Sequence, residues 1–400
     1  MAPRSDRYLV DSLRAWLTVV ATFVSSAVTL GIAYSFGAFF TDMAAEFGSS
    51  RASTAVIFAI TTFAFFWLSL ITGRLADRVG PRPVLALGAL FLLVGLLATS
   101  RAQSLWVGYL TYGIGVGVAA ATGYIPMVAA VGGWFEQKRA TAVGLAVAGI
   151  GVGTLVISPL SAVLIDRWGW RDTYRVYAVV GATLLFVCVA LIDRPPGFAG
   201  PQKARFGEAI GSPVFVRLQA SALCSGLALF VPFVFVGQYA QERGAGRVAA
   251  AILVSVLGGA SVLARVGFGS AVRRFGSVAL YRRSFVLLTL SFGIWLFAGD
   301  SFAMLVAFAL VLGIGYGGFV ALSTIVIAEH MGVAALGSVL ALFYTTQGLG
   351  GLVGPFLAGL VIDATNSYRP VIVACIGLAA AAWLLLRPLP VAADGSLKAL

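Results

Sequence analysis

Arg265 is the residue whose type and position could do chemistry. It lies in an apolar block, 247–271, long enough to cross a bilayer, where a cation costs at least about 2.5 to 3.5 kcal/mol. Arg273, eight residues on, marks the nearer polar end, roughly 12 Å away. Helical side chains lean toward the helix N-terminus, so Arg265 leans away from that end. Its planar guanidinium suits a substrate carboxylate; the alternatives are a structural hydrogen-bond hub and a snorkelling side chain.

The sequence provides no obvious counter-charge for Arg265. All 15 acidic residues fall in loops or at the ends of apolar blocks, and the single histidine, His330, lies at the end of such a block. We therefore expect the substrate itself to be the counter-anion, and a monovalent anion balances one cation. A coupling proton would travel with the carboxylic acid or on a group such as Tyr34.

The elements that position Arg265 are predicted to be membrane helices. Hydrophobic residues make up 60% of the 400 residues, charged residues only 10%, and the mean hydropathy is +0.99. A helix needs about 20 apolar residues to cross the hydrocarbon core, and the chain has twelve such blocks. The predicted spans are 16–40, 52–72, 83–100, 105–131, 139–165, 172–192, 214–240, 247–271, 283–298, 302–327, 334–363 and 368–387.

The basic residues predict the orientation in the membrane. Eighteen of the 27 lysines and arginines lie on the side of the N-terminus, eight lie on the other side, and Arg265 lies within a span. Cytoplasmic loops carry the excess of Lys and Arg, so we expect both termini in the cytoplasm and a multi-pass protein of the plasma (inner) membrane. The same loops explain the net charge of +12, so no nucleic-acid partner is expected.

An internal repeat predicts two related halves. Three features recur after 196 to 200 residues: the loops 73–80 and 269–276, the glycine runs 113–117 and 313–317, and Pro159 with Pro355. Such repeats are common in transporters. We expect an N-terminal six-helix bundle at 1–193, a cytoplasmic linker at 194–213 and a C-terminal six-helix bundle at 214–400.

Several stretches resemble a known family. The loop Gly73-x-x-x-Asp77-Arg78-x-Gly80-x-Arg82 resembles that of the major facilitator superfamily. Within that superfamily, 134–149, 35–40, 229–235 and 264–269 are similar to the monocarboxylate transporters. The resemblance implies an all-α membrane fold of two six-helix bundles with pseudo-two-fold symmetry, and secondary transport by alternating access.

The resemblance also implies roles for particular residues. Helices 1, 4, 5, 7, 8, 10 and 11 would line the cavity, and the candidate substrate-binding residues are Arg265, Tyr34, Tyr124, Leu145, Phe319, Phe343, Tyr344 and Gln347. A second set would latch the cytoplasmic helix ends in one conformation, unless it is an ordinary basic loop. This conformational gate consists of Gly73, Asp77, Arg78, Gly80 and Arg82.

Three positions depart from the family pattern. Tyr34 stands where animal members carry a lysine, and Ser261 stands where they carry an aspartate, so their proton-handling pair is missing. Gln347 stands where the oxalate:formate branch carries a second cation. A site with one cation is poorly suited to a dianion.

These observations predict a transporter of small monocarboxylates of the lactate and pyruvate class, working by proton symport. One alternative is a drug or other organic-anion exporter or antiporter of the same fold; Ser158-Pro159 and the anion preference of Arg265 disfavour drug efflux. The other is a transporter-like substrate sensor. No phosphate-binding glycine loop and no Ser/His/Asp set exists in the sequence, so we expect no catalytic residues, metal or cofactor. The expected partners are the bilayer, a monocarboxylate and a proton, with a monomeric chain.

Overall fold

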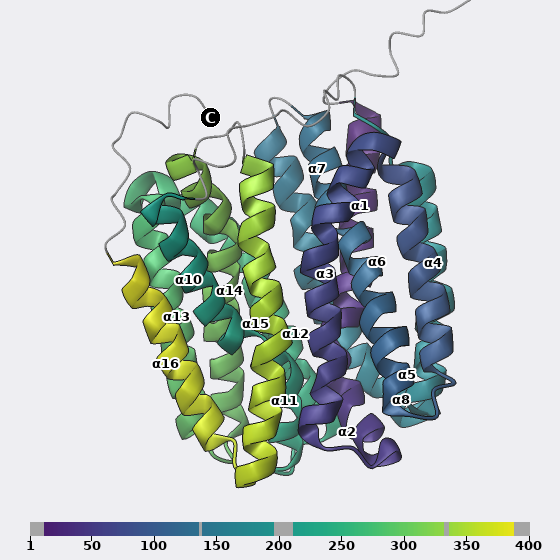
Figure 1. Ribbon diagram of the computed structural model, residues 1–400, viewed down its shortest axis with the longest axis vertical. Coiled ribbons are helices and arrows are strands. Elements are labelled where there is room, and N and C mark those ends of the chain that lie inside the picture. The colour runs from purple at the N-terminus through teal and green to yellow at the C-terminus, as the bar shows by residue number, and fades with distance from the viewer. Residues whose placement is uncertain (1–11, 136–137, 196–210, 332–335, 388–400) are drawn as a thin grey trace, which may run out of the picture.

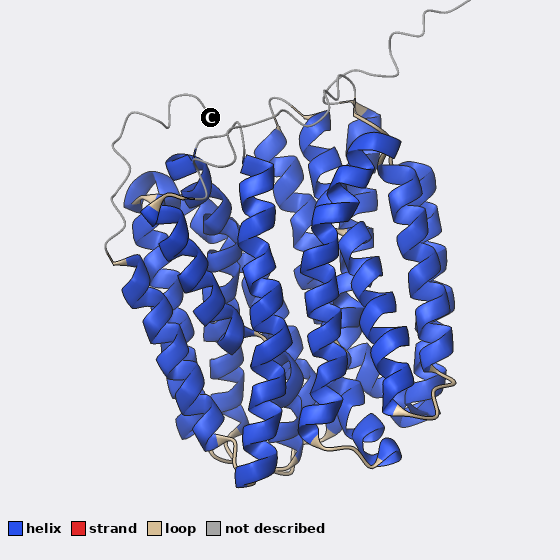
Figure 2. Cartoon of the chain, in the orientation of Figure 1, coloured by secondary structure: helices blue, strands red, loops and turns tan. Residues whose placement is uncertain are grey.

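The computed structural model describes residues 12–135, 138–195, 211–331 and 336–387. Within these ranges every regular element is a helix, and most of the helices run nearly parallel along the long axis of the molecule (Figure 1, Figure 2). This arrangement satisfies the backbone hydrogen bonds within each helix, as a bilayer requires.

The first half begins with two helices separated by a break at Ser35. Gly48, in the left-handed region at φ +57°, ends the second of them, so the first membrane pass continues beyond the predicted residue 40. The fourth pass includes a π-helical turn, η2. The elements are α1 (Leu13–Tyr34), α2 (Phe36–Phe47), α3 (Arg51–Val79), α4 (Pro81–Thr99), α5 (Leu105–Gly108), η2 (Tyr109–Ile114), α6 (Gly115–Gly123), α7 (Ile125–Trp134) and α8 (Arg139–Leu191).

The second half repeats this pattern with fewer interruptions. Its first pass is again broken, at Phe230, and its later helices are continuous. The elements are α10 (Pro213–Leu229), α11 (Val231–Gln241), α12 (Arg247–Phe275), α13 (Ser277–Ala298), α14 (Phe302–Met331), α15 (Leu336–Thr365) and α16 (Arg369–Leu386).

The described residues contain eleven helical segments long and apolar enough to cross a membrane. One of these, α8, has 53 residues and a non-helical Gly169 (φ +76°, ψ 165°) where the chain turns back. It therefore contains two passes, and the prediction of twelve is confirmed. The predicted loop between residues 165 and 172 is wrong, because helix continues on both sides of this single glycine.

Close helix crossings explain two further glycines, one in each half. A Cβ on Gly153 of α8 would lie 2.1 Å from the carbonyl oxygen of Ala27 on α1. A Cβ on Gly354 of α15 would lie 2.2 Å from the carbonyl oxygen of Leu227 on α10. These are equivalent crossings in the two halves, and small residues permit them.

The two halves meet along two pairs of helices. The first is α3 with α15, which run side by side at the centre of Figure 1, and the second is α8 with α12. On the second seam, a Cβ on Gly151 would lie 2.8 Å from the carbonyl oxygen of Gly258. Arg265 lies two turns further along α12, so this seam positions it beside the first half.

Candidate functional site

Arg265 reaches across the seam between the halves. Its Nη1 donates a hydrogen bond of 3.0 Å to the backbone carbonyl of Val147 on α8. Its Nε and Nη2 are buried and have no hydrogen-bond partner in the described structure. A buried donor without a partner is costly, and most such groups in folded proteins are paired. Two unpaired donors on one side chain therefore indicate a site for a hydrogen-bond acceptor.

The identity of the two unpaired nitrogens limits what that ligand can be. In a guanidinium group the Nε–H and one Nη2–H point in the same direction along one edge. A carboxylate offers two oxygens at the matching separation and accepts both bonds side by side. Because Val147 occupies Nη1 on another edge, the arginine is held at one point and presents the free edge.

Tyrosine side chains surround the guanidinium. The ring centroid of Tyr316 on α14 lies 5.7 Å from the guanidinium carbon of Arg265. Tyr34 of α1 interacts with Tyr316 through its hydroxyl group. Tyr124, between α6 and α7, and Tyr344 of α15 also lie close enough to Arg265 to interact with it electrostatically. The structure thus brings together four of the predicted residues, with contributions from both halves. These four are Arg265, Tyr34, Tyr124 and Tyr344.

Aromatic contacts fix these tyrosines in place. Tyr34 stacks on Phe233 of α11, with ring centroids 4.6 Å apart and an interplanar angle of 28°. Tyr344 stacks on Phe66 of α3 at 6.0 Å and its hydroxyl lies 3.0 Å from the hydroxyl of Ser323. Both stacking pairs join one half to the other, so the cluster belongs to the seam.

Tyr316 was not among the predicted residues. It lies inside the glycine run 313–317, which the sequence suggests is a packing motif. Gly313 and Gly317 do pack closely, since a Cβ on either would lie within 2.4 Å of a carbonyl oxygen of α12. The available signal was the single aromatic residue among glycines that bring its helix against the helix of Arg265.

The structure places two other predicted residues in packing positions. Phe319 is buried against Tyr281 and Phe285. Phe343 is fully buried, with its ring 6.1 Å from that of Phe319 and 5.3 Å from that of Tyr344. Both therefore support Tyr344 from within the second half.

Gln347 is held by hydrogen bonds to another helix, and Leu145 lies close in sequence to the carbonyl that bonds Arg265. The Nε2 of Gln347 donates to the carbonyl of Ala222, at 2.7 Å, and to the hydroxyl of Ser225, at 3.2 Å, so the amide joins α15 to α10. Leu145 lies on α8 two residues before Val147 and is 49% exposed.

The predicted gate residues lie at the opposite end of α3 from Arg51. Arg82 donates from Nε to the carbonyl of Ile192 at 2.6 Å and pairs with Asp193 at 3.5 Å. The backbone carbonyl of Asp77 accepts a bond of 2.7 Å from Arg194, and that of Arg78 a longer one. Gly80, at φ +94°, ends α3, and both Gly73 and Gly80 have open space where a Cβ would be. These contacts join parts of the first half to one another and to Arg194, the first residue of the predicted linker.

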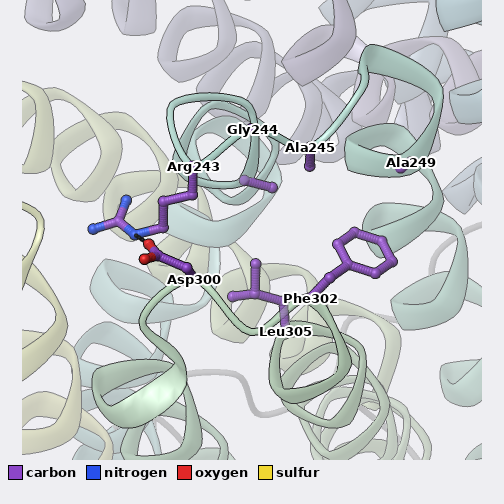
Figure 3. Close-up of a pocket in the computed structure, with 8 residues that line it drawn as sticks. Arg243, Gly244, Ala245, Ala249, Asp300, Phe302 and Leu305 are labelled. Carbon is purple, nitrogen blue, oxygen red and sulfur yellow. Dashed lines mark ion pairs between the residues drawn. The ribbon is translucent and has the colours of Figure 1, made fainter.

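A cavity of about 240 Å³ lies elsewhere in the second half, between the end of α11 and the start of α14 (Figure 3). Arg243 pairs there with Asp300 at 3.5 Å and stacks over the ring of Tyr239 at 3.6 Å. Phe302 and Leu305 supply an apolar wall. The charges of this cavity are paired within one half, unlike that of Arg265.

The geometry defines a helical membrane protein with a cationic site between two halves, and comparison with known proteins identifies the class. A family model described as Major Facilitator Superfamily matches residues 21–299 and 221–399. The chain belongs to this superfamily of secondary transporters. It is therefore a multi-pass membrane transporter and not an enzyme.

Within this superfamily, the chain is similar at modest sequence identity to several curated proteins. Monocarboxylate transporter 3 of Rattus norvegicus is 29% identical over 384 residues, covering 92% of this chain and 78% of that protein. Monocarboxylate transporter 13 of the same species is 29% identical over 362 residues, with 88% and 83% covered. The MFS-type transporter pynF of Aspergillus niger is 28% identical over 367 residues, with 89% and 83% covered. The predicted resemblance to the monocarboxylate transporters is confirmed.

The solved structures support the fold alone. The nucleoside transporter NupG, solved as a point mutant, superimposes with a TM-score of 0.75 over 94% of this chain and 99% of that chain, at 14% identity. The all-α membrane fold predicted from the sequence is confirmed.

Proposed function

We propose that this transporter carries small monocarboxylates of the lactate and pyruvate class together with a proton, by alternating access. The observation that carries the proposal is the pair of unpaired donors, Nε and Nη2, on one edge of Arg265. The curated relatives named as monocarboxylate transporters support the same class of substrate.

The charge of the site favours a monovalent anion. Arg265 forms no ion pair within the described residues, and its surroundings are tyrosines and a backbone carbonyl. One carboxylate neutralises one guanidinium, whereas a dianion would leave a charge buried without a partner. The position of a possible second cation holds the neutral Gln347.

The tyrosine hydroxyls give the substrate its other contacts. Tyr34, Tyr124, Tyr316 and Tyr344 can each donate or accept one hydrogen bond, which suits an oxygen beside the carboxylate of a short acid. The coupling proton travels on the acid itself or on a hydroxyl of this cluster. Leu145, Phe319, Phe343 and Gln347 complete or support the walls of the site.

Transport proceeds by movement of the halves 1–193 and 214–400 about this site. The linker 194–213 lies mostly outside the described residues. Both termini lie in the cytoplasm, and the protein acts as a monomer in the plasma membrane. Gly73, Asp77, Arg78, Gly80 and Arg82 hold the cytoplasmic ends of the helices together when the outer end is open.

The proposal is tested by uptake of labelled L-lactate into proteoliposomes with an inside-alkaline pH gradient. We expect gradient-driven uptake by the wild type and a loss of roughly 100-fold in Arg265→Ala, as for removal of one partner of a buried charge pair. Arg265→Lys keeps the charge but not the two-donor edge, so it should restore little of the uptake.

The other outcomes separate the parts of the proposal. Uptake that does not respond to the pH gradient would keep the anion site and remove the proton. An unchanged rate in Arg265→Ala would reject the anion site. Absence of any lactate uptake by the wild type would redirect the search to other organic anions and to the exporter alternative.

A further inference from the structure

The outer end of the molecule, where α2 ends and α3 begins, is joined by ion pairs between the halves. This end is the lower one in Figure 1. Arg247, the first residue of α12, pairs with both oxygens of Asp42 on α2, its Nη2 lying 3.0 Å from Oδ1. Its Nε lies 2.7 Å from Asp166 on α8. One arginine of the second half thus holds two carboxylates of the first.

A second cluster at the same end reverses the charges. The carboxylate of Asp363 on α15 accepts hydrogen bonds from the backbone N–H of Arg51, at 3.2 Å, and of Ala52, at 2.9 Å. These are the first two residues of α3, where N–H groups have no partner within the helix and the helix dipole favours an anion. The Arg51 side chain lies 2.8 Å from Glu242 and 3.8 Å from Asp363.

The two clusters are copies of one another in sequence. Arg51 and Arg247 are 196 residues apart, Asp166 and Asp363 are 197 apart, and Asp42 and Glu242 are 200 apart. These spacings equal those of the internal repeat. In each half, the arginine at the start of the second membrane pass therefore meets the aspartate at the end of the fifth pass of the opposite half.

The two clusters differ in how their residues make contact across the seam between the halves. Arg247 binds two partners from the first half, and Asp363 binds the helix terminus of α3 together with the Arg51 side chain. Arg51 makes its closest side-chain contact with Glu242, whose carboxylate also accepts a bond of 2.7 Å from Tyr368. Arg247 thus bonds two carboxylates of the opposite half, and Asp363 bonds the backbone of α3 as well as a side chain; both residues belong to the second half.

We propose that Arg247 and Asp363 are the two anchor residues that hold the outer end of this transporter closed, and that releasing them is a required step of the transport cycle. The proposal rests on the alternating-access function but not on the identity of the substrate. Arg247 and Asp363 contribute more to closure than Arg51. Loss of either anchor opens the outer end, whereas loss of the Arg51 side chain leaves Asp363 bonded to the backbone of α3.

A single cysteine at Gly237 can report on this opening. Gly237 is buried on α11, one helical turn before the end of that helix. The nearest atom to a Cβ there is the carbonyl oxygen of Gly37 of the opposite half, at 4.0 Å. Gly237→Cys should therefore fit without strain and be shielded while the halves touch. The probe is a membrane-impermeant maleimide applied to the outer face, and the chain with its native Cys188, Cys224 and Cys375 gives the background.

In the Gly237→Cys background we expect labelling roughly tenfold faster with Arg247→Gln or Asp363→Ala, because the rate follows the population of the outward-open state. Arg51→Gln should raise it only about twofold. The matched control is Arg175→Gln, since Arg175 pairs with Asp172 of its own half at 2.6 Å at the same end; it should label at the parent rate.

A charge exchange guards against a folding artefact. In Asp42→Arg with Arg247→Asp, the charges of this pair are exchanged across the seam, but Asp166 then faces a like charge. Labelling should therefore return part of the way toward the parent rate. Parent-rate labelling of both anchor variants, or equal acceleration by Arg175→Gln, would overturn the proposal. The assay needs no substrate, so failure of lactate uptake leaves its result intact.

Discussion

The two ends of the molecule use similar charged residues in different ways. At the outer end, Arg247 and Asp363 contact residues of the opposite half. At the inner end, Arg14 and Arg82 both pair with Asp193, at 3.0 and 3.5 Å, within the first half. The same kinds of side chain therefore join the halves at one end and strengthen a single half at the other.

This difference shows which conformation the chain has adopted. Ion pairs across a seam must break before the seam can open, whereas pairs within one half move with it as a rigid unit. The structure is therefore closed at the end where α2 ends and α3 begins, which is the outer end in the proposed orientation. Arg265 lies between the two ends, on the seam of α8 with α12, where its bond to Val147 is one more contact between the halves.

After the variants of Arg265, Arg247 and Asp363, the largest effect is expected from Tyr316, which lies beside Arg265 and away from both ends of the molecule. Tyr316→Phe removes a hydroxyl that we expect to bond the substrate, so the KM for lactate should rise about tenfold, near the lower end of the range for one hydrogen bond to a charged group. Labelling of Gly237→Cys should stay at the parent rate, because neither end changes.

Tyr239→Phe is the control for Tyr316→Phe. Tyr239 lies at the outer end of the second half, and its hydroxyl makes only a bond of 3.4 Å to the carbonyl of Gly299. Its loss should leave the KM unchanged. Equal KM changes in the two variants would argue that Tyr316 acts through packing alone.

The comparison predicts opposite signs for variants at the two ends. If Arg82 stabilises the conformation in which the inner end is closed, Arg82→Gln should favour the outer-closed conformation further. External labelling of Gly237→Cys should then fall about threefold, as expected for loss of an exposed ion pair that forms across the halves only in that conformation. Faster labelling in Arg82→Gln would contradict the assignment of this loop as the inner latch.

Much of the architecture was predictable because its signals are local. Apolar blocks of about 20 residues mark the passes, and a fixed spacing marks the repeat. Arg265 stood out because a cation within such a block is costly. The boundary between the fifth and sixth passes was not predicted correctly, because the single residue Gly169 takes the place of the expected loop and helix continues on both sides of it.

The contacts between halves were not predictable from the same signals. Asp42, Asp166 and Asp363 appeared only as acids at the ends of spans, and their partners lie far away in sequence, in the other half of the chain. Which face of a helix meets the site depends on its rotation, which is set by packing against neighbours. That is why the sequence did not single out Tyr316.

Gln347 gives the smallest expected effect on transport and the clearest test of that rotation. Its amide bonds Ala222 and Ser225 within the second half, so Gln347→Leu should change the KM for lactate by less than about twofold while removing bonds worth about 1 to 3 kcal/mol of stability. The measurements are uptake kinetics and the thermal unfolding temperature in detergent, which should fall. A large rise in KM with unchanged thermal stability would instead place the amide in contact with the substrate, and the helix would have to rotate during the cycle to bring it there.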